Sequence, residues 1–112
     1  MDCIFCKIAS GEIPTQCLYE DDRVIAFKDL SPQAPIHFLV IPKEHIKSAA
    51  QLTEENAAIV AHIFTVIAQL TEKLGLKNGY RIVNNCGKDG GQSVEHLHFH
   101  VLGGRMLAWP PG

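Results

Sequence analysis

Three histidines alternate with apolar residues in segment 96–102, which reads His-Leu-His-Phe-His-Val-Leu. In an extended strand, a period of two would place His96, His98 and His100 on one face and the apolar residues on the other. Imidazole titrates near neutral pH, attacks electrophiles and binds metal ions. The segment therefore predicts either a nucleophilic histidine with helpers or a metal cluster. Three surface histidines placed by chance are the plainer interpretation.

The segment just before the histidines, 84–93, holds three glycines within five residues. Glycine lets backbone N–H groups approach a ligand closely, and such groups form nests that suit a phosphate. It is not a Walker loop, because neither a helix nor Gly-Lys-Ser/Thr follows. Alone the segment is typical of a flexible hairpin, but beside the histidines it favours a phosphate held over a row of imidazoles.

Two kinds of chemistry compete for the histidines. A nucleophilic imidazole keeps its attacking nitrogen unprotonated while an acceptor holds its other N–H. His98 stands in the middle, where flanking groups could relay protons and balance charge. A catalytic zinc ion is the alternative, but three alternating histidines on one strand are an awkward tetrahedral set without further ligands. The pattern favours the nucleophile.

A second motif is Cys3-x-x-Cys6, which has the spacing of half a zinc site. Two buried reduced thiols are the plainer interpretation. A thioredoxin-like redox pair is disfavoured, because no βαβ pattern surrounds the two cysteines.

The elements that must position these residues follow from periodicity and turn signals. The patterns predict a short helical turn at 3–9, a long helix at 53–74, and strands at 16–20, 23–28, 38–41, 80–84 and 94–102. Thr53 is placed to cap the long helix and Gly75 to end it. This composition predicts an α+β domain, with about five antiparallel strands and one long helix across them. His62, on the polar stripe of that helix, is expected to be an ordinary solvated residue.

Bulk composition narrows the function classes. The 112 residues fit one domain spanning 1–112, and a net charge of −2 argues against binding to polymeric nucleic acid. Neither an apolar run of membrane length nor a secretory signal pattern occurs in the sequence. Four cysteines are few for a disulfide scaffold, which favours reduced thiols and a cytoplasm-like compartment. The apolar stripe of helix 53–74 is wide enough to suggest a partner as well as the chain's own sheet.

The heptad at 96–102 fits the His-φ-His-φ-His-φ-φ signature of the histidine triad (HIT) superfamily. Further segments resemble its Hint branch, the histidine triad nucleotide-binding proteins. These are Phe-Cys-Lys-Ile at 5–8, Phe-Lys-Asp-Leu-Ser-Pro-Gln-Ala-Pro at 27–35, His-Phe-Leu-Val-Ile-Pro-Lys at 37–43, Gly-Gly-Gln-Ser-Val at 90–94, and a tail ending Trp-Pro-Pro-Gly. The resemblance covers essentially the whole chain.

The resemblance implies a homodimer whose two sheets join into one, and a purine nucleoside phosphoramidate hydrolase that needs no cofactor for its chemistry. It implies that His98 is the nucleophile, supported by His100, His37, His96 and Ser93. It also implies a nucleotide site lined by Phe5, Ile8, Phe27, Asp29, Leu30, Asn85, Gly91, Gln92, Ser93, His98, His100 and, in the partner's site, Trp109. Asp29 would bind the ribose, although it also suits a turn cap before Ser31, and the aromatic and aliphatic members could be plain core.

The resemblance to bacterial relatives also supplies two histidines for the cysteine motif, His45 and His96. With Cys3 and Cys6 they would bind a structural zinc ion, and His96 would then orient the site instead of carrying protons. Two other functions stay open at this point. One is a nucleotide-binding regulatory dimer in which hydrolysis is incidental, and the other is a metal-dependent phosphohydrolase using the three alternating histidines directly.

Overall fold

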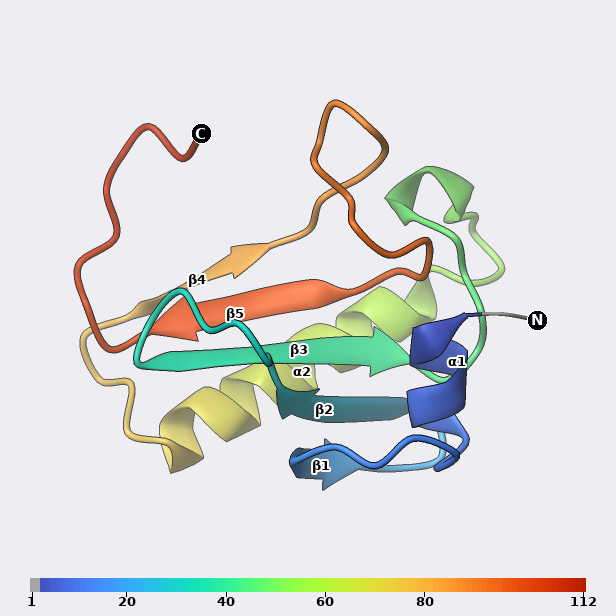
Figure 1. Cartoon of the computed structure of the whole chain (residues 1–112), viewed down its shortest axis with the longest axis horizontal. Helices are drawn as coiled ribbons and strands as arrows, with labels where there is room; N and C mark the ends of the chain where they lie inside the picture. The colour runs from blue at the N-terminus through green and yellow to red at the C-terminus, as the bar shows by residue number, and fades with distance from the viewer. Residues whose placement is uncertain (1–2) are drawn as a thin grey trace.

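The computed structural model describes residues 3–112, which fold into one antiparallel sheet and two α-helices. In chain order the elements are α1 (Ile4–Ala9), β1 (Cys17–Glu20), β2 (Val24–Lys28), β3 (Ile36–Pro42), the 3₁₀ turn η1 (Ala49–Gln51), α2 (Ala58–Lys73), β4 (Tyr80–Val83) and β5 (Phe99–Gly103). The five strands lie in the order β1-β2-β3-β5-β4, so the chain crosses over once to put β5 in the interior (Figure 1). The predicted α+β architecture is confirmed.

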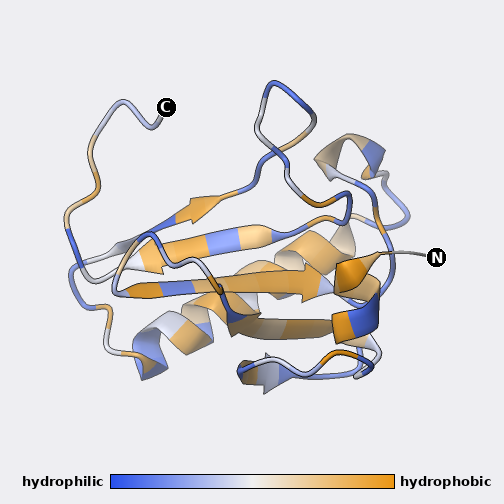
Figure 2. Cartoon of the chain, in the orientation of Figure 1, coloured by the Kyte–Doolittle hydropathy of each residue, from blue (hydrophilic) through white to orange (hydrophobic). Residues whose placement is uncertain are grey.

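The two faces of the sheet carry two separate cores, because side chains alternate along each strand. α2 covers one face and α1 part of the other (Figure 1), and β2 and β3 are hydrophobic almost throughout (Figure 2). The core on the α2 side consists of Val24, Ala26, Phe38, Val40, Ile46, Ile63, Val66, Ile67, Leu70, Leu97, Phe99 and Val101. The core on the α1 side consists of Cys3, Phe5, Ile8, Ile25, Phe27, Leu39 and Ile41.

The long helix is shorter than the sequence predicts at its N-terminal end. It begins at Ala58 instead of residue 53, and Thr53 does not cap it. The Asn56 side chain accepts a hydrogen bond from the Thr53 N–H (2.7 Å) and donates to the Gln51 carbonyl (3.3 Å). Such local bonds compete with helical ones, so the first turn stays irregular. The other end is as predicted, because Gly75 has a φ of 76° and terminates the helix.

The last strand also begins later than predicted, at Phe99 instead of residue 94, so His96 and His98 precede it. The alternation nevertheless survives, because Leu97 lies in the same core as the apolar residues of β5. The Leu97 N–H donates to the Ile46 carbonyl at 2.6 Å, outside the sheet's own ladder. This bond holds the segment before β5 extended while residues 94–96 bend away. The three histidines therefore still point toward the α1 side.

His62 is not the ordinary solvated residue that the sequence suggests. Its Nε2 lies 2.7 Å from Asp21 Oδ2, and the Tyr19 hydroxyl donates to the same oxygen at 2.7 Å. Burial acts to raise the pKa of Asp21, but hydrogen bonds from Tyr19, His62 and the backbone outweigh it and hold that pKa far below its usual range. His62 thus ties α2 to the turn between β1 and β2.

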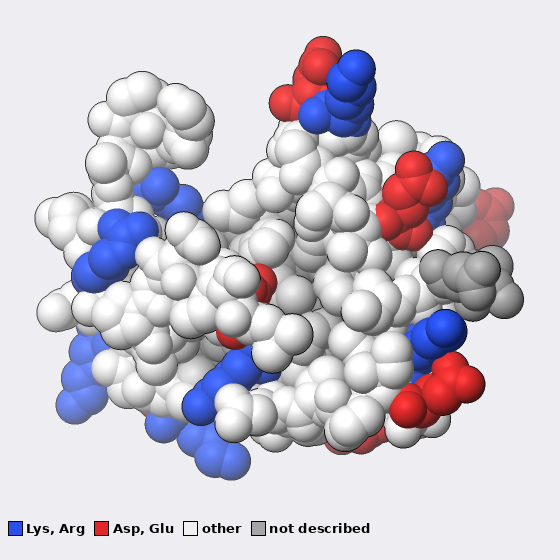
Figure 3. All heavy atoms as spheres, viewed as in Figure 1, with Lys and Arg blue, Asp and Glu red and all other residues white. Residues whose placement is uncertain are grey.

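Most charged side chains on the face seen in Figure 3 lie around its margin, and the hollowed middle of that face is uncharged except for a few acidic atoms within it. Within residues 3–112, none of the helices has both the length and the apolar character needed to cross a bilayer.

Candidate active site

A main-chain carbonyl selects the tautomer of His98. The residue is 2% exposed, and its Nδ1 lies 2.7 Å from the carbonyl oxygen of His96. A carbonyl can only accept, so Nδ1 carries a hydrogen, and in the neutral ring the lone pair is on Nε2. The edge-to-face contact of Phe5 with this ring, at 5.1 Å between centroids, limits the ring's freedom to turn.

A chain of hydrogen bonds sets the forms of two further histidines. The Gln33 N–H donates to Nδ1 of His37 at 3.0 Å, so the hydrogen of a neutral His37 sits on Nε2. That Nε2–H donates to Nδ1 of His100 at 2.9 Å. A neutral His100 therefore carries its own hydrogen on Nε2, and its ring lies 5.1 Å from that of His98 between centroids. We call His37 and His100 the relay; in its neutral form it ends in an N–H on His100, whose ring lies next to that of His98.

The electrostatics of the site keep the relay neutral at pH 7. Burial lowers the pKa of His100 to about 4, with the nearby His98 and His37 acting in the same direction and Asp29 opposing them. Burial also lowers the pKa of His37, again against the pull of Asp29. Neutral rings are the condition under which each nitrogen has the role that the hydrogen bonds assign.

The sequence left open whether Asp29 caps a turn or belongs to the site, and its two carboxylate oxygens do one each. Its Oδ1 accepts the Ser31 N–H at 2.7 Å, which is the turn cap. Its Oδ2 faces the relay, 3.4 Å from Nε2 of His37 and 3.9 Å from Nδ1 of His100. The carboxylate is thus at the site, and it also fixes the loop that follows β2.

At least one amide of the expected anion nest, that of Gly91, is already hydrogen-bonded within the glycine-rich loop. The Gly91 N–H donates to the Lys88 carbonyl at 3.1 Å, so this amide is already hydrogen-bonded within the turn and does not point at a ligand. The Gln92 side chain holds the loop together, accepting from the Gly87 N–H at 2.9 Å and donating to the carbonyls of Lys47 (2.8 Å) and Val94 (2.9 Å). The role that the structure shows for these residues is to shape the loop.

The remaining predicted loop residues, Asn85 and Ser93, lie half-buried and exposed in the same segment. Gly90 is the position that requires glycine, because a Cβ there would collide with the carbonyl oxygen of Cys86 and lie 2.8 Å from its nitrogen. The loop therefore folds back on its own start, next to the histidines.

Three residues of the predicted base pocket pack together in this chain. Phe5, Ile8 and Phe27 are all buried, with relative exposures of 4–7%, in the α1-side core. Leu30 is 99% exposed and Trp109 is 78% exposed, so their predicted place in the nucleotide site stays a prediction. The Trp109 ring lies under the guanidinium of Arg81, at 5.7 Å.

Four donor atoms converge beneath the active site, from Cys3, Cys6, His45 and His96, and all lie within 4.8 Å of one another. We call this set the Cys₂His₂ cluster. Cys6 Sγ lies 3.2 Å from His45 Nδ1 and 3.5 Å from His96 Nδ1, and Cys3 Sγ lies 3.4 Å from His96 Nδ1. Sulfur and nitrogen ligands of one tetrahedral zinc ion would lie about 3.5 Å apart. The separations fit that ion.

The second nitrogen of His96 supports the same conclusion. Its Nε2–H donates to the Pro42 carbonyl at 2.8 Å, which leaves the Nδ1 lone pair facing the thiols. Burial, with the nearby Cys3, raises the pKa of Cys6, so a cation is needed to favour the thiolate that zinc binds. The residues present fit a closed, structural zinc site.

The three alternating histidines do not share one metal position. The ring of His96 turns to the thiols, whereas His98 and His100 face each other. In residues 3–112 the other donor cluster is Asp29, His37 and His100. There, Nε2 of His37 carries the hydrogen, because the Gln33 amide occupies Nδ1, so it has no lone pair for a metal. The geometry favours the nucleophile over the metal-dependent alternative.

Sequence reasoning missed three groups that hold this site. Two are main-chain groups, the Gln33 N–H and the Pro42 carbonyl, which leave no signal in the residue types. The third is Asn84, whose amide donates to the His98 carbonyl at 2.9 Å. Its place between the end of a strand pattern and the glycine-rich loop was the available signal, whereas the family resemblance indicates the neighbouring Asn85.

Known proteins resemble this chain along nearly all of its length. Residues 2–108 match the family model described as scavenger mRNA decapping enzyme C-term binding. An uncharacterized HIT-like protein of Synechococcus elongatus is 50% identical over 99% of this chain and 97% of its own length. The crystal structure of a HIT family hydrolase from Legionella pneumophila Philadelphia 1 has 46% identity and a TM-score of 0.97, covering 99% of this chain and 100% of that one.

A histidine triad nucleotide-binding protein from Candida albicans is more distant, at 34% identity and a TM-score of 0.82, covering 97% of this chain and 83% of that one. The shared fold, the sequence identity to these relatives and the alternating histidines at 96–102 all indicate the same family. The chain belongs to the histidine triad (HIT) superfamily.

Proposed function

We propose that this protein is a hydrolase of purine nucleoside phosphoramidates that acts through a covalent nucleotidyl intermediate on His98. The observation that carries the proposal is the fixed form of the His98 ring, with Nδ1–H on the His96 carbonyl and Nε2 free. The ring of His100 is adjacent, and its Nε2–H would donate to a phosphoryl oxygen of the bound substrate. Support comes from a solved relative named a hydrolase and another named nucleotide-binding.

The chemistry proceeds in two displacements at phosphorus. Nε2 of His98 attacks, the P–N bond breaks, and the amine leaves with a proton taken from the solvent. Neutral His100 keeps its Nε2–H, because losing it would leave an imidazolate, and donates it as a hydrogen bond to a phosphoryl oxygen. Water then attacks the nucleotidyl group, its proton goes to the solvent, and the bond to His98 breaks to release the monophosphate. Two inversions retain configuration at phosphorus. His37 holds the His100 ring in this orientation.

The direct test is hydrolysis of adenosine 5′-phosphoramidate by wild type and His98→Ala. The variant should fold and bind AMP but lose turnover on the order of 10⁴-fold, because the covalent step needs the imidazole. Trapped wild-type protein should carry the nucleotide on the peptide containing His98. A label on His96 or His100 would contradict the assignment.

A nucleotide-binding regulatory dimer is the second candidate, in which hydrolysis is incidental. It predicts tight AMP binding with negligible turnover of every phosphoramidate offered. The fixed tautomer of His98 argues for the enzyme, because a binding module has no need of a buried imidazole whose Nε2 is left without a hydrogen-bond partner among residues 3–112.

Zinc belongs to this proposal as a structural ion in the Cys₂His₂ cluster. Its four ligands leave no position for water, so the ion would supply stability and no chemistry. It would fasten the start of α1 to His96, whose carbonyl orients the nucleophile. Elemental analysis of protein purified without chelator should give about one zinc per chain. Less than about a tenth of an equivalent, with freely reactive thiols, would contradict it.

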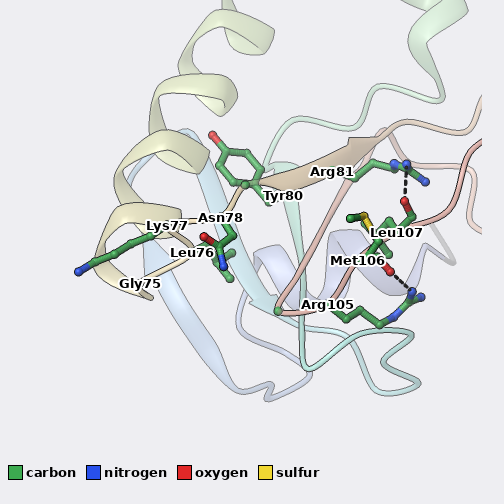
Figure 4. Close-up of a pocket in the computed structure, with 11 residues that line it drawn as sticks. Gly75, Leu76, Lys77, Asn78, Tyr80, Arg81, Arg105, Met106 and Leu107 are labelled. Atoms are coloured by element: carbon green, nitrogen blue, oxygen red, sulfur yellow. Dashed lines mark hydrogen bonds between the residues drawn. The ribbon is translucent and has the colours of Figure 1, made fainter.

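We further propose a homodimer that joins the two sheets through β4 and α2. Phe64 and Tyr80 are 44% and 40% exposed on these elements, and β4 is an edge of the sheet. Beside that edge lies a hollow of about 810 Å³, lined by 75–81 and 104–107 (Figure 4). A second copy's edge and tail would fill it, and would bring Trp109 to the neighbouring site. Sedimentation should give about twice 12.3 kDa, and a monomer at micromolar concentration would refute the dimer.

All four cysteines are free thiols in the structure. They fit a reducing compartment, which together with the nucleotide substrate favours the cytoplasm as the site of action.

A further inference from the structure

The sheet stops just short of the nucleophile. The last residue pair between β4 and β5 is Val83 opposite His100. His98 lies two residues before that pair, so the ladder does not fix its main chain. Beyond the last pair, the side chain of Asn84 binds the main chain of His98: its Nδ2 donates to the His98 carbonyl at 2.9 Å. A side-chain bond thus stands where a strand-to-strand bond would otherwise be.

The opposite side of the same segment has one comparable anchor, the Leu97 N–H on the Ile46 carbonyl at 2.6 Å. The main chain at 97–98 is therefore held between two groups that come from different parts of the chain. The His98 ring is held in turn by the His96 carbonyl. Its position follows the main chain, because the ring's own bond reaches only two residues back along that chain.

We propose that Asn84 is a positioning residue for His98, fixing the main chain that aims Nε2 at the substrate phosphorus. The hydrogen bond that the structure shows for the Asn84 side chain goes to the His98 carbonyl, so Asn84 acts on the ring through the main chain. Reaction at phosphorus needs the nucleophile within a few tenths of an ångström of its productive place, and a misplacement of 1 Å costs about 10²-fold in rate. This inference rests on the proposed function for its kinetic consequences only.

The test compares Asn84→Ala and Asn84→Asp with a matched control. The aspartate keeps the shape of the side chain but removes the hydrogens it donates, so it separates packing from donation. Asn56→Ala is the control, since Asn56 also donates from its amide to a backbone carbonyl, that of Gln51, far along the chain from the histidines. Readouts are kcat, the Kd for AMP, the thermal midpoint, and the imidazole NMR resonances of His98 in ¹⁵N-histidine-labelled protein.

Both Asn84 variants should lower kcat for adenosine 5′-phosphoramidate by about tenfold or more, with the larger loss in the aspartate. The Kd for AMP should stay within about twofold, and the His98 resonances should shift. Asn56→Ala should lower the thermal midpoint without moving kcat or these resonances. Folded Asn84 variants with wild-type kcat, or with unshifted His98 resonances, would overturn the inference. If wild type does not hydrolyse the phosphoramidate, the proposed function fails, and the resonances alone decide the role of Asn84.

Discussion

The neutral form of His100 should make the stability of this fold depend on pH in a predictable direction. Its pKa falls from 6.5 to about 4 in the folded protein, mainly through burial. As pH drops, the unfolded chain therefore takes up a proton at His100 before the folded chain does. The contribution of His100 is full above about pH 6.5, is lost between about pH 6.5 and 4, and stays lost below that range.

The size of the loss follows from the two pKa values. Each tenfold change in proton affinity corresponds to about 1.4 kcal/mol, so the gap from 6.5 to about 4 corresponds to about 3 kcal/mol in full. The His100 side chain is only 19% exposed, so solvent screening reduces this figure little. Between pH 7.5 and pH 4.5 the protein should lose about 2 kcal/mol of its free energy of unfolding through His100 alone.

The assay is urea unfolding of wild type and His100→Gln at both pH values and at one protein concentration. Glutamine keeps a hydrogen-bonding side chain but does not titrate. Losses from other acid-sensitive groups, including the Cys₂His₂ cluster, occur in both proteins and cancel to first order. The stability difference between wild type and variant should move by about 2 kcal/mol in favour of the variant at pH 4.5. A difference that stays constant with pH would refute the neutral, buried His100 and with it the relay.

Three other outcomes are expected. Chelation of a zinc-loaded Cys₂His₂ cluster should lower the melting temperature more than the initial turnover, and an immediate loss of activity would point instead to a catalytic metal. Gly90→Ala should weaken AMP binding, because its Cβ would meet the Cys86 backbone, whereas Gly112→Ala, in open space, should change nothing measurable by calorimetry. His62→Ala should lower the free energy of unfolding by about 1 kcal/mol through loss of the Asp21 contact, and a denaturation midpoint equal to wild type would show that the contact is idle.

Residue types and their periods were enough to predict much of this fold. The period of two at 96–102 placed the three histidines on one side, and the glycine at position 75 marked a helix end, as the structure confirms. The start of that helix was wrong because a side chain, Asn56, competes with backbone bonds, and propensity does not register such local bonds. Strand β5 was predicted too long because alternation continues through a segment that has left the ladder.

The candidate site was predictable in its reactive groups and not in its supports. Histidine and cysteine indicate their chemistry by residue type, so the alternating histidines and the Cys3-x-x-Cys6 half-site can be predicted from the residues alone, whereas the pairing of these cysteines with His45 and His96 came from the family resemblance. What holds them is largely main chain, such as the Pro42 carbonyl on His96, and any residue type supplies a carbonyl. The polar partner of His62 comes from 41 residues away, and no local pattern connects the two.

One backbone amide, that of Gln33, decides which nitrogen of His37 bears hydrogen, and through it the orientation of every proton in the relay. Side-chain replacement at position 33 leaves this amide in place, and proline is the one natural residue that removes it. The direction of the hydrogen bonds in the relay is therefore set by the path of the main chain. As far as the relay is concerned, we expect position 33 to tolerate every residue except proline. A protein with proline there would lose the donor-acceptor direction of the relay while keeping every histidine.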